Sequence, residues 1–243
     1  MVRITFLGTS NAFGHKGRHT SCYLIQGSKI ILLDAGYSLF SAIRSKFDKF
    51  PNIDAILISH NHPDHFMGLP QLVLEDLYVI KRNYKIPIFG PIGLKNLIHD
   101  VCKIIYNEDV LAHVNELFIF HEYGPDMKFN IPGGKVETLP AKHSGNARMQ
   151  IISLDNKQIG YTGDTTLELE YFNRLLECDI LITETSSYEL HIPDHITFKE
   201  LQNLDIDDSK RIYLSHLGAD VIERSNEILP PFYIAFDGLE IDI

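Results

Sequence analysis

The sequence predicts an α/β protein in which two β-sheets lie face to face and helices cover both outer faces. Short apolar segments bounded by Gly, Pro, Asn and Asp turns alternate along the chain with segments whose apolar residues recur at helical spacing. This mixture excludes a helical bundle and an all-β barrel. No Pro-, Gly- or Ser-rich linker divides the 243 residues, so we expect residues 1–243 to form one domain.

The first half of the chain is expected to begin with strands, and its second and third strands are joined by Gln26-Gly27-Ser28, which is typical of a hairpin. The predicted strands are Val2–Leu7, Ser21–Ile25, Lys29–Asp34, Ala55–Ser59, Ile86–Phe89 and Leu117–Phe120. The predicted helices are Tyr37–Phe47, Phe66–Lys81 and Gly93–Tyr106.

The second half continues the same alternation of strands and helices. The predicted strands are Gly134–Leu139, Met149–Leu154, Gln158–Thr162, Ile180–Glu184, Arg211–Ser215, Tyr233–Phe236 and Glu240–Ile243. The predicted helices are Leu167–Glu177, Thr197–Leu204 and Val221–Leu229.

The composition is that of a globular protein, with 44% hydrophobic and 22% charged residues. The net charge of −10 argues against a general nucleic-acid coat protein, because nonspecific binding to phosphates requires a basic surface. Three cysteines far apart in the sequence indicate a reducing compartment. No apolar run approaches the ~18 residues of a membrane span, and no signal-peptide core is present. We therefore expect a cytoplasmic protein without a membrane partner.

The clearest functional signal is Ser59-His60-Asn61-His62-Pro63-Asp64-His65, between a predicted strand and a predicted helix. Three histidines and an aspartate this close cannot all be core residues, and imidazoles contribute little to a solvated surface. They combine nitrogen and oxygen ligands that suit Zn²⁺ or other first-row divalent ions. Residues two apart on a tight loop can point the same way, so His60 and His62 can hold one ion while Asp64 and His65 face a second.

Three later residues, His143, Asp164 and His216, each follow an apolar strand. Taken singly, each has an ordinary explanation as a surface or turn residue. Ligands that converge from strand ends are, however, how a sheet scaffold builds a rigid site. Together with the histidine cluster, these residues indicate one metal centre.

This order of residues resembles the signature of the metallo-β-lactamase superfamily. The resemblance extends over nearly the whole chain through Phe6-Leu7-Gly8-Thr9-Ser10, Leu32-Leu33-Asp34-Ala35-Gly36 and Ala235-Phe236-Asp237-Gly238-Leu239-Glu240. It implies a four-layer αββα sandwich, classed as α/β or by some schemes α+β, with two metal ions at one edge. The ions would be Zn²⁺ by default, with Mn²⁺ or Fe as alternatives.

The resemblance also implies a role for each candidate ligand. His60, His62 and His143 would bind the first ion, and Asp64, His65 and His216 the second. Asp164 would bridge both ions, as would a water or hydroxide. Asp34 would accept a hydrogen bond from a ligating histidine of the loop.

A second set of features resembles ribonuclease Z and its smaller relatives, which include cyclic phosphodiesterases. These features are Phe6–Ser10, Ile88–Leu94 and the pair Glu184…His195-Ile196-Thr197. By this resemblance Glu184 and His195 would form a relay that protonates the leaving group, and Asp64 would join them in catalysis.

The resemblance therefore implies a dinuclear metal-dependent phosphodiesterase that uses a metal-bridging hydroxide on RNA or small, including cyclic, phosphodiesters. One alternative is hydrolysis of a thioester, lactone or β-lactam at the same site. A metal-binding sensor without turnover is a third alternative, which the complete set of ligand positions does not favour.

Ribonuclease Z carries a long tRNA-gripping arm between the counterparts of His143 and Asp164, and here residues 144–163 leave room for one hairpin only. We therefore expect phosphodiester substrates, with RNA as one option, and no stable broad nucleic-acid binding. Relatives often dimerise through the region between His65 and His143, which makes a homodimer one option. The candidates for a local phosphate-binding rim are Lys16, Arg18, Lys142 and Arg148. Four further histidines without partner motifs are expected at the surface, namely His99, His113, His121 and His191.

Overall fold

The computed structural model describes all of residues 1–243 and contains two seven-stranded sheets. The strands of the first sheet are β1 (Arg3–Gly8), β2 (Cys22–Gln26), β3 (Ile30–Leu33), β4 (Ala55–Leu57), β5 (Ile86–Pro91), β6 (Phe118–Tyr123) and β14 (Glu240–Asp242). Those of the second sheet are β7 (Lys128–Ile131), β8 (Gly134–Pro140), β9 (Arg148–Leu154), β10 (Lys157–Tyr161), β11 (Ile180–Glu184), β12 (Ile212–Ser215) and β13 (Phe232–Ile234).

The strand order is β14-β1-β2-β3-β4-β5-β6 in the first sheet and β13-β12-β11-β10-β9-β8-β7 in the second. The last strand thus returns to the first sheet, where β14 pairs antiparallel with β1 and Asp242 lies opposite Arg3. The predicted hairpin is present as the antiparallel pair β2–β3.

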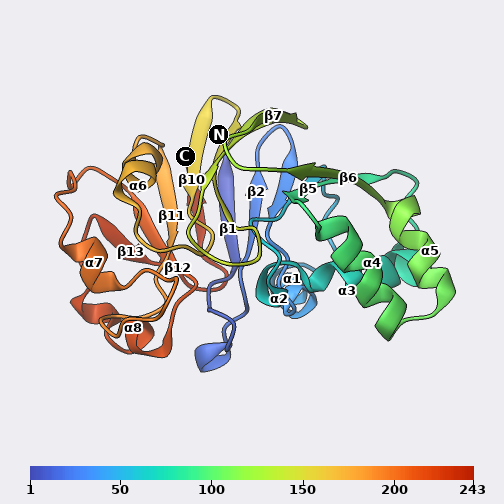
Figure 1. The fold of residues 1–243 in the computed structure, drawn as a ribbon, viewed down its shortest axis with the longest axis horizontal. Coiled ribbons are helices and arrows are strands. Elements are labelled where there is room, and N and C mark those ends of the chain that lie inside the picture. Colours follow the sequence, from blue (N-terminus) through green and yellow to red (C-terminus); the bar gives the residue numbers. More distant parts are fainter.

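Helices cover the outer face of each sheet, as Figure 1 shows. The helices over the first sheet are α1 (Leu39–Lys46), α2 (Pro63–Phe66), α3 (Gly68–Glu75), α4 (Leu94–Ile105) and α5 (Glu108–Leu117), with a π-helical turn at Asp76–Ile80. Those over the second sheet are α6 (Leu169–Leu176), α7 (Phe198–Gln202) and α8 (Ala219–Glu223). None of these helices combines the length and the apolar character that a membrane crossing requires.

The layers follow from side-chain alternation along the strands, because successive residues point to opposite faces of a sheet. Phe6 and Tyr23 belong to the core between the two sheets. Their neighbours Leu7 and Leu24 belong to the core beneath α1–α5. A third core lies between the second sheet and α6–α8. The predicted four-layer αββα sandwich is confirmed.

Two predicted segments are organised differently from the expectation. The helix expected over Phe66–Lys81 is divided into α2, α3 and the π-helical turn. Leu117, expected to open a strand, is the last residue of α5, a helix that the prediction lacked, as it lacked β7. α5 packs on the outer face of the first sheet, and β7 is the edge strand of the second sheet. Neither contributes a residue to the predicted site.

Candidate metal centre

The histidine-rich segment forms the turn that connects β4 to α2. Pro63 occupies the first position of α2, where its fixed φ suits the helix and its missing N–H is not needed. His60 and His65 are completely buried, and Asp64 is 6% exposed. His143 follows β8, Asp164 follows β10 and His216 follows β12. All seven side chains predicted as ligands therefore approach one edge of the sandwich.

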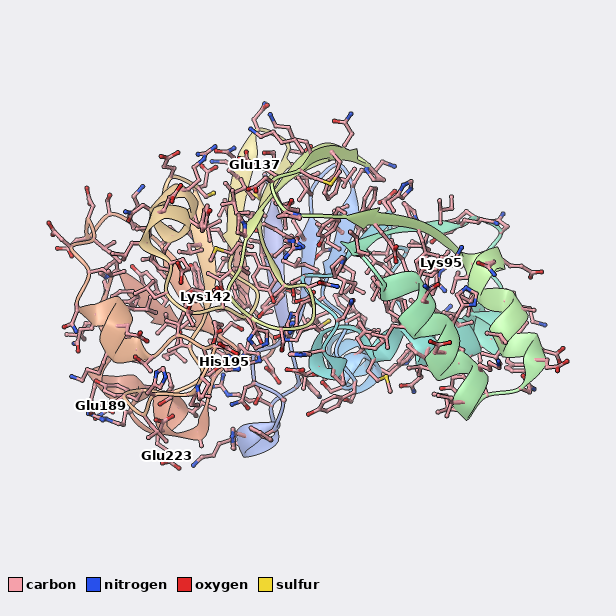
Figure 2. The ribbon with its side chains drawn as sticks, viewed as in Figure 1. Lys95, Glu137, Lys142, Glu189, His195 and Glu223 are labelled. Atoms are coloured by element: carbon pink, nitrogen blue, oxygen red, sulfur yellow. The ribbon has the colours of Figure 1, made fainter.

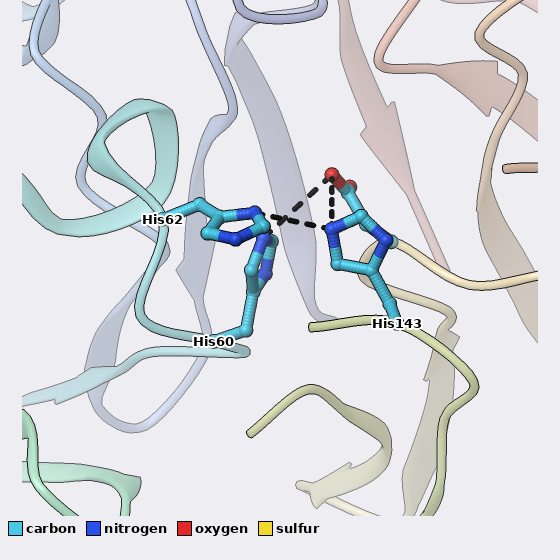
Figure 3. A group of neighbouring side chains, drawn as sticks. His60, His62 and His143 are labelled. Carbon is cyan, nitrogen blue, oxygen red and sulfur yellow. Dashed lines mark hydrogen bonds and ion pairs between the residues drawn. The ribbon is translucent and has the colours of Figure 1, made fainter. Parts of the chain in front are cut away.

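The first donor group consists of His60, His62, His143 and Asp164, whose donor atoms all lie within 4.8 Å of one another. Figure 3 shows the three imidazoles converging on a carboxylate. Nδ1 of His62 lies 3.1 Å from Nε2 of His143. The Asp164 carboxylate lies 3.7 Å from Nε2 of His60 and 3.8 Å from Nε2 of His143. Tetrahedral zinc with bonds of 2.0–2.1 Å would space its nitrogen ligands roughly 3.3 Å apart, so the group has a suitable size.

The second donor group consists of Asp64, His65, Asp164 and His216. Nε2 of His65 lies 3.4 Å from a carboxylate oxygen of Asp64 and 3.4 Å from one of Asp164. Nε2 of His216 lies 3.2 Å from Asp64 and 3.3 Å from Asp164. Asp164 therefore belongs to both groups, which is the position that the sequence predicts for a bridging residue.

The pKa shifts of His60 and Asp164 favour the protonation states that bind a cation. Burial and the neighbouring His65 hold the pKa of His60 well below its usual range, so His60 is neutral. Burial opposes ionisation of Asp164, but His216 and His65 outweigh it and hold its pKa well below the usual range. Nε2 of His60, Nε2 of His65 and Oδ1 of Asp164 are buried without a hydrogen-bond partner. A buried polar atom without a partner is costly, and one divalent cation in each donor group would satisfy all three.

Asp34 contacts a histidine of the second donor group, as the sequence predicts. It is completely buried, and its carboxylate lies 2.7 Å from Nδ1 of His65. The backbone N–H of Ser59 donates to the same carboxylate at 2.7 Å, and the Tyr161 hydroxyl donates at 2.6 Å. Asp34 thus orients His65 by its second nitrogen, as partners of metal-binding histidines usually do. The Tyr161 contact was not predicted, because it depends on the pairing of the two sheets.

The predicted Glu184–His195 pair is present beside the second group. Nδ1 of His195 lies 3.0 Å from each carboxylate oxygen of Glu184. Burial disfavours the charged imidazole, but Glu184 outweighs this effect and raises the pKa of His195 to about 9. The backbone N–H of Thr165 donates to Oε1 of Glu184 at 2.7 Å, which anchors the carboxylate. The Ser186 hydroxyl, which no sequence pattern identified, donates to Oε2 at 2.7 Å.

A small pocket of about 240 Å³ opens over both donor groups. Its apolar lining is Ala12, Phe13 and Ile192. Its polar lining includes His195 and five of the seven predicted ligands, namely His62, Asp64, His143, Asp164 and His216. Phe13 is 78% exposed. Figure 2 shows His195 on the side of the C-terminal half that faces the N-terminal loop. The pocket is thus bounded by the two loops that carry Phe13 and Ile192.

None of the four basic candidates for a phosphate-binding rim lines the pocket over the donor groups, and each contacts another group of the protein. Nη1 of Arg18 donates to the Ala235 carbonyl at 2.6 Å and to Thr9 Oγ1 at 2.9 Å. Lys16 pairs with Glu223, and Lys142 pairs with Glu168. The guanidinium of Arg148 bonds to the Ala147 carbonyl.

One of the four histidines expected at the surface is instead part of a buried network. Nε2 of His113 lies 2.9 Å from Oδ2 of Asp76, whose side chain is 1% exposed. The expectation of a surface position is therefore wrong for His113. His121 and His191 are exposed as expected, and His99 is half-buried.

Comparison with known proteins shows which family the chain matches. Residues 2–228 match the family model described as "Anti-Pycsar protein Apyc1". An anti-Pycsar protein Apyc1 from Paenibacillus harenae is 26% identical over 228 residues, covering 92% of each chain. Ribonuclease Z from Methanocaldococcus jannaschii is 25% identical over 284 residues, covering 90% of this chain and 86% of that one.

The fold is shared with a metallo-β-lactamase fold protein, YhfI from Bacillus subtilis, with a TM-score of 0.79, 17% identity and full coverage of both chains. The predicted resemblance to the metallo-β-lactamase superfamily and its ribonuclease Z-like branch is confirmed.

Proposed function

This chain belongs to the anti-Pycsar Apyc1 family, and we propose that it hydrolyses small phosphodiesters, cyclic nucleotides among them, at a centre for two Zn²⁺ ions. It is a metal-dependent hydrolase of the metallo-β-lactamase fold. The proposal rests on one arrangement of side chains. Asp164 belongs to both donor groups, and the Glu184–His195 pair, which is suited to protonating a leaving group, lies beside them.

The proposal assigns the first cation to His60, His62 and His143, and the second to Asp64, His65 and His216, with Asp164 shared. When bound, the two cations would activate water and offset the negative charge that builds on the phosphoryl oxygens. Asp34 keeps the His65 ring oriented by accepting from its Nδ1. Asp64 holds the second group together and faces the pocket.

His195 acts on the leaving group in this proposal. Glu184 accepts the proton on Nδ1, so Nε2 is the nitrogen left to serve the substrate. The oxygen of water joins phosphorus as the water gives up one proton to solvent, the bond to the departing oxygen breaks, and that oxygen takes the proton from Nε2 of His195, which solvent then restores. Glu184 keeps the ring in this orientation and stabilises its charged form.

The pocket favours a small substrate with an aromatic group. Its volume of about 240 Å³ lies just below the range of roughly 300–1,000 Å³ that is usual for ligand pockets. Phe13 offers an exposed ring at the rim, and a nucleobase can stack on such a ring. Between His143 and Asp164 the chain forms only β9, β10 and short loops, so no extended segment there reaches toward a large RNA.

Turnover of several substrates by the zinc-loaded protein tests the proposal. We expect hydrolysis of 3′,5′-cyclic nucleotides and of bis-p-nitrophenyl phosphate, and no hydrolysis of nitrocefin or of a thioester. Turnover of nitrocefin or the thioester without turnover of either phosphodiester would overturn the proposal in favour of a non-phosphate esterase.

The variant His195→Ala tests the leaving-group role. It should keep its metal and slow cyclic nucleotide hydrolysis by about 10²–10⁴-fold, the usual effect of a lost general acid. The defect should be smaller with bis-p-nitrophenyl phosphate, because p-nitrophenolate leaves without a proton. His191→Ala, at an exposed histidine of the same loop, is the control and should match the wild type. An equal defect with both substrates would remove His195 from this role.

A further inference from the structure

A buried serine hydroxyl connects the two parts of the site. Ser186 lies two residues beyond the end of β11 and is 4% exposed. Its Oγ lies 2.9 Å from Nδ1 of His216 and 2.7 Å from Oε2 of Glu184. Nδ1 of His195 is 3.1 Å away. One hydroxyl therefore contacts a proposed metal ligand and both members of the Glu184–His195 pair.

The hydrogen-bonding capacity of serine fixes the direction of these bonds. A hydroxyl has one proton to donate and two lone pairs that accept. An ionised carboxylate can only accept, so the 2.7 Å contact with Glu184 uses the Ser186 proton. Nδ1 of His216 must then be the donor in its 2.9 Å contact with Oγ.

The direction of this bond determines which nitrogen of His216 is free. With the proton on Nδ1, the neutral ring has its lone pair on Nε2. Nε2 is the atom that lies 3.2 Å from Asp64 and 3.3 Å from Asp164, inside the second donor group. Metal binding requires this unprotonated nitrogen.

We propose that Ser186 is a positioning residue that selects the metal-binding tautomer of His216 and, with the same hydroxyl, aligns Glu184 for His195. The inference deepens the proposed function and rests on its metal assignment. Thr165 also holds Glu184, through Oε1. Loss of the Ser186 hydroxyl should therefore weaken the Glu184–His195 pair rather than release it.

A pair of variants isolates the hydroxyl at nearly constant shape. Ser186→Thr keeps an Oγ, whereas Ser186→Val replaces it with a methyl group. We expect Ser186→Val to lower Zn²⁺ affinity by about 10- to 100-fold, the usual effect of losing a partner of a ligating histidine. Ser186→Thr should recover most of the affinity. Competition between the protein and a chromogenic chelator measures the affinity without reference to turnover.

A spectroscopic measurement tests the tautomer directly. Long-range ¹H–¹⁵N correlation on the zinc-loaded wild type should show the His216 proton on Nδ1, with Nε2 unprotonated, and this signature should weaken or exchange in Ser186→Val. Ser187→Ala, whose hydroxyl donates to Asp220 outside the site, is the control and should match the wild type. Ser186→Ala replaces Ser186→Val if the valine variant does not fold by circular dichroism.

The kinetic result separates this inference from the proposed function. Ser186→Val, assayed at saturating zinc, should lower kcat for cyclic nucleotides more than for bis-p-nitrophenyl phosphate, with little change in KM. Wild-type zinc affinity and an unchanged His216 signal in the hydroxyl-free variants would overturn the inference. If the wild type cleaves no phosphodiester, the proposed function fails, while affinity and tautomer still decide the role of Ser186.

Discussion

Asp164 is the residue on which both donor groups depend. Its carboxylate lies within 3.8 Å of nitrogens from His60, His65, His143 and His216. A shared carboxylate offsets the repulsion between two adjacent dications, which a terminal ligand does less effectively. Asp164→Ala should therefore lose metal from both positions and most of the activity.

Metal content by mass spectrometry after gel filtration checks this prediction. His62→Ala, which removes a donor from the first group alone, is the matched control and should keep the second ion. Two ions retained by Asp164→Ala would contradict a shared role.

Asp237 connects the last loop of the chain to the first. Its carboxylate accepts hydrogen bonds from Thr9 Oγ1 and from the His19 backbone N–H, both at 2.7 Å, and lies 3.0 Å from Nδ1 of His19. Burial opposes its ionisation, but His19 and Thr9 outweigh burial and hold the pKa of Asp237 below its usual value. A carboxyl group whose pKa is lower in the folded than in the unfolded state stabilises the folded protein at pH values above the unfolded-state pKa. This stabilisation is lost as the pH falls through the folded-state pKa.

Asp237→Asn should therefore destabilise the protein at pH 7 by about 1–3 kcal/mol, the range for a hydrogen-bonded charge. The difference from the wild type should shrink below about pH 4, where the unfolded carboxyl takes up its proton. Urea unfolding at several pH values measures both effects. A chelator is present throughout, so that loss of metal does not contribute to the change in the free energy of unfolding. Asp208→Asn, at an exposed position, is the control. A difference that does not vary with pH would contradict the prediction.

Single residues show how far the sequence predicts the site. The seven predicted ligands, Asp34 and the Glu–His pair follow strand ends or form a tight motif, so order and spacing identify them. Ser186 meets His216 only because β11 and β12 are neighbours in the sheet. A hydroxyl that acquires its partner through tertiary packing leaves no pattern along the chain.

At the scale of elements, the π-helical turn is tied to α5 by a buried charge network. Oδ1 of Asp76 lies 2.6 Å from Nη1 of Arg82, and Oδ2 lies 2.9 Å from Nε2 of His113. The side chains of Arg82 and Asp76 are 2% and 1% exposed. Removing one partner of a buried ion pair leaves the other charge buried and uncompensated.

Asp76→Ala should lower the free energy of unfolding by about 3–5 kcal/mol. Glu116→Ala, which removes the 74%-exposed partner of His113, should cost less than about 1 kcal/mol. Urea denaturation measures both, and metal content should be unaffected because none of these residues belongs to a donor group. Equal costs for the two variants would contradict a buried network.

The elements that the prediction lacked have recognisable causes. In α5, Asn107 caps the N-terminus by accepting from the Val110 N–H, and Val110, Val114 and Leu117 recur at helical spacing. Those signals were present in the sequence but cover only ten residues. β7 has only four residues, two of them polar, and pairing with β8 at the sheet edge stabilises it. Such a short edge strand depends on its neighbour rather than on its own sequence.

At the scale of the whole molecule, charge limits the size of the substrate. The net charge is −10, and each of the four basic candidates for a phosphate-binding rim contacts a carboxylate or a backbone carbonyl of the protein. Phosphate contacts provide most nucleic-acid affinity. We therefore expect precursor tRNA to bind only in the ~10⁻⁴–10⁻⁶ M range of nonspecific contacts at physiological salt.

Fluorescence anisotropy at two salt concentrations, with a cleavage assay on precursor tRNA, measures this expectation. The same preparation should hydrolyse cyclic nucleotides, which serves as the control for an intact site. Nanomolar binding with a single cut after the discriminator base would contradict the prediction and identify a tRNA endonuclease.

The return of β14 to the first sheet has a consequence for synthesis on the ribosome. β1 is synthesised more than 230 residues before its outer neighbour, Glu240–Asp242. At about 5–20 residues per second, the β1 edge waits roughly ten to fifty seconds for that partner. During this interval a nascent chain presents open backbone donors and acceptors beside Ile4 and Phe6, and an unpaired strand edge invites association with other chains. Chaperone contact with β1 would therefore matter most before β14 is released from the ribosome.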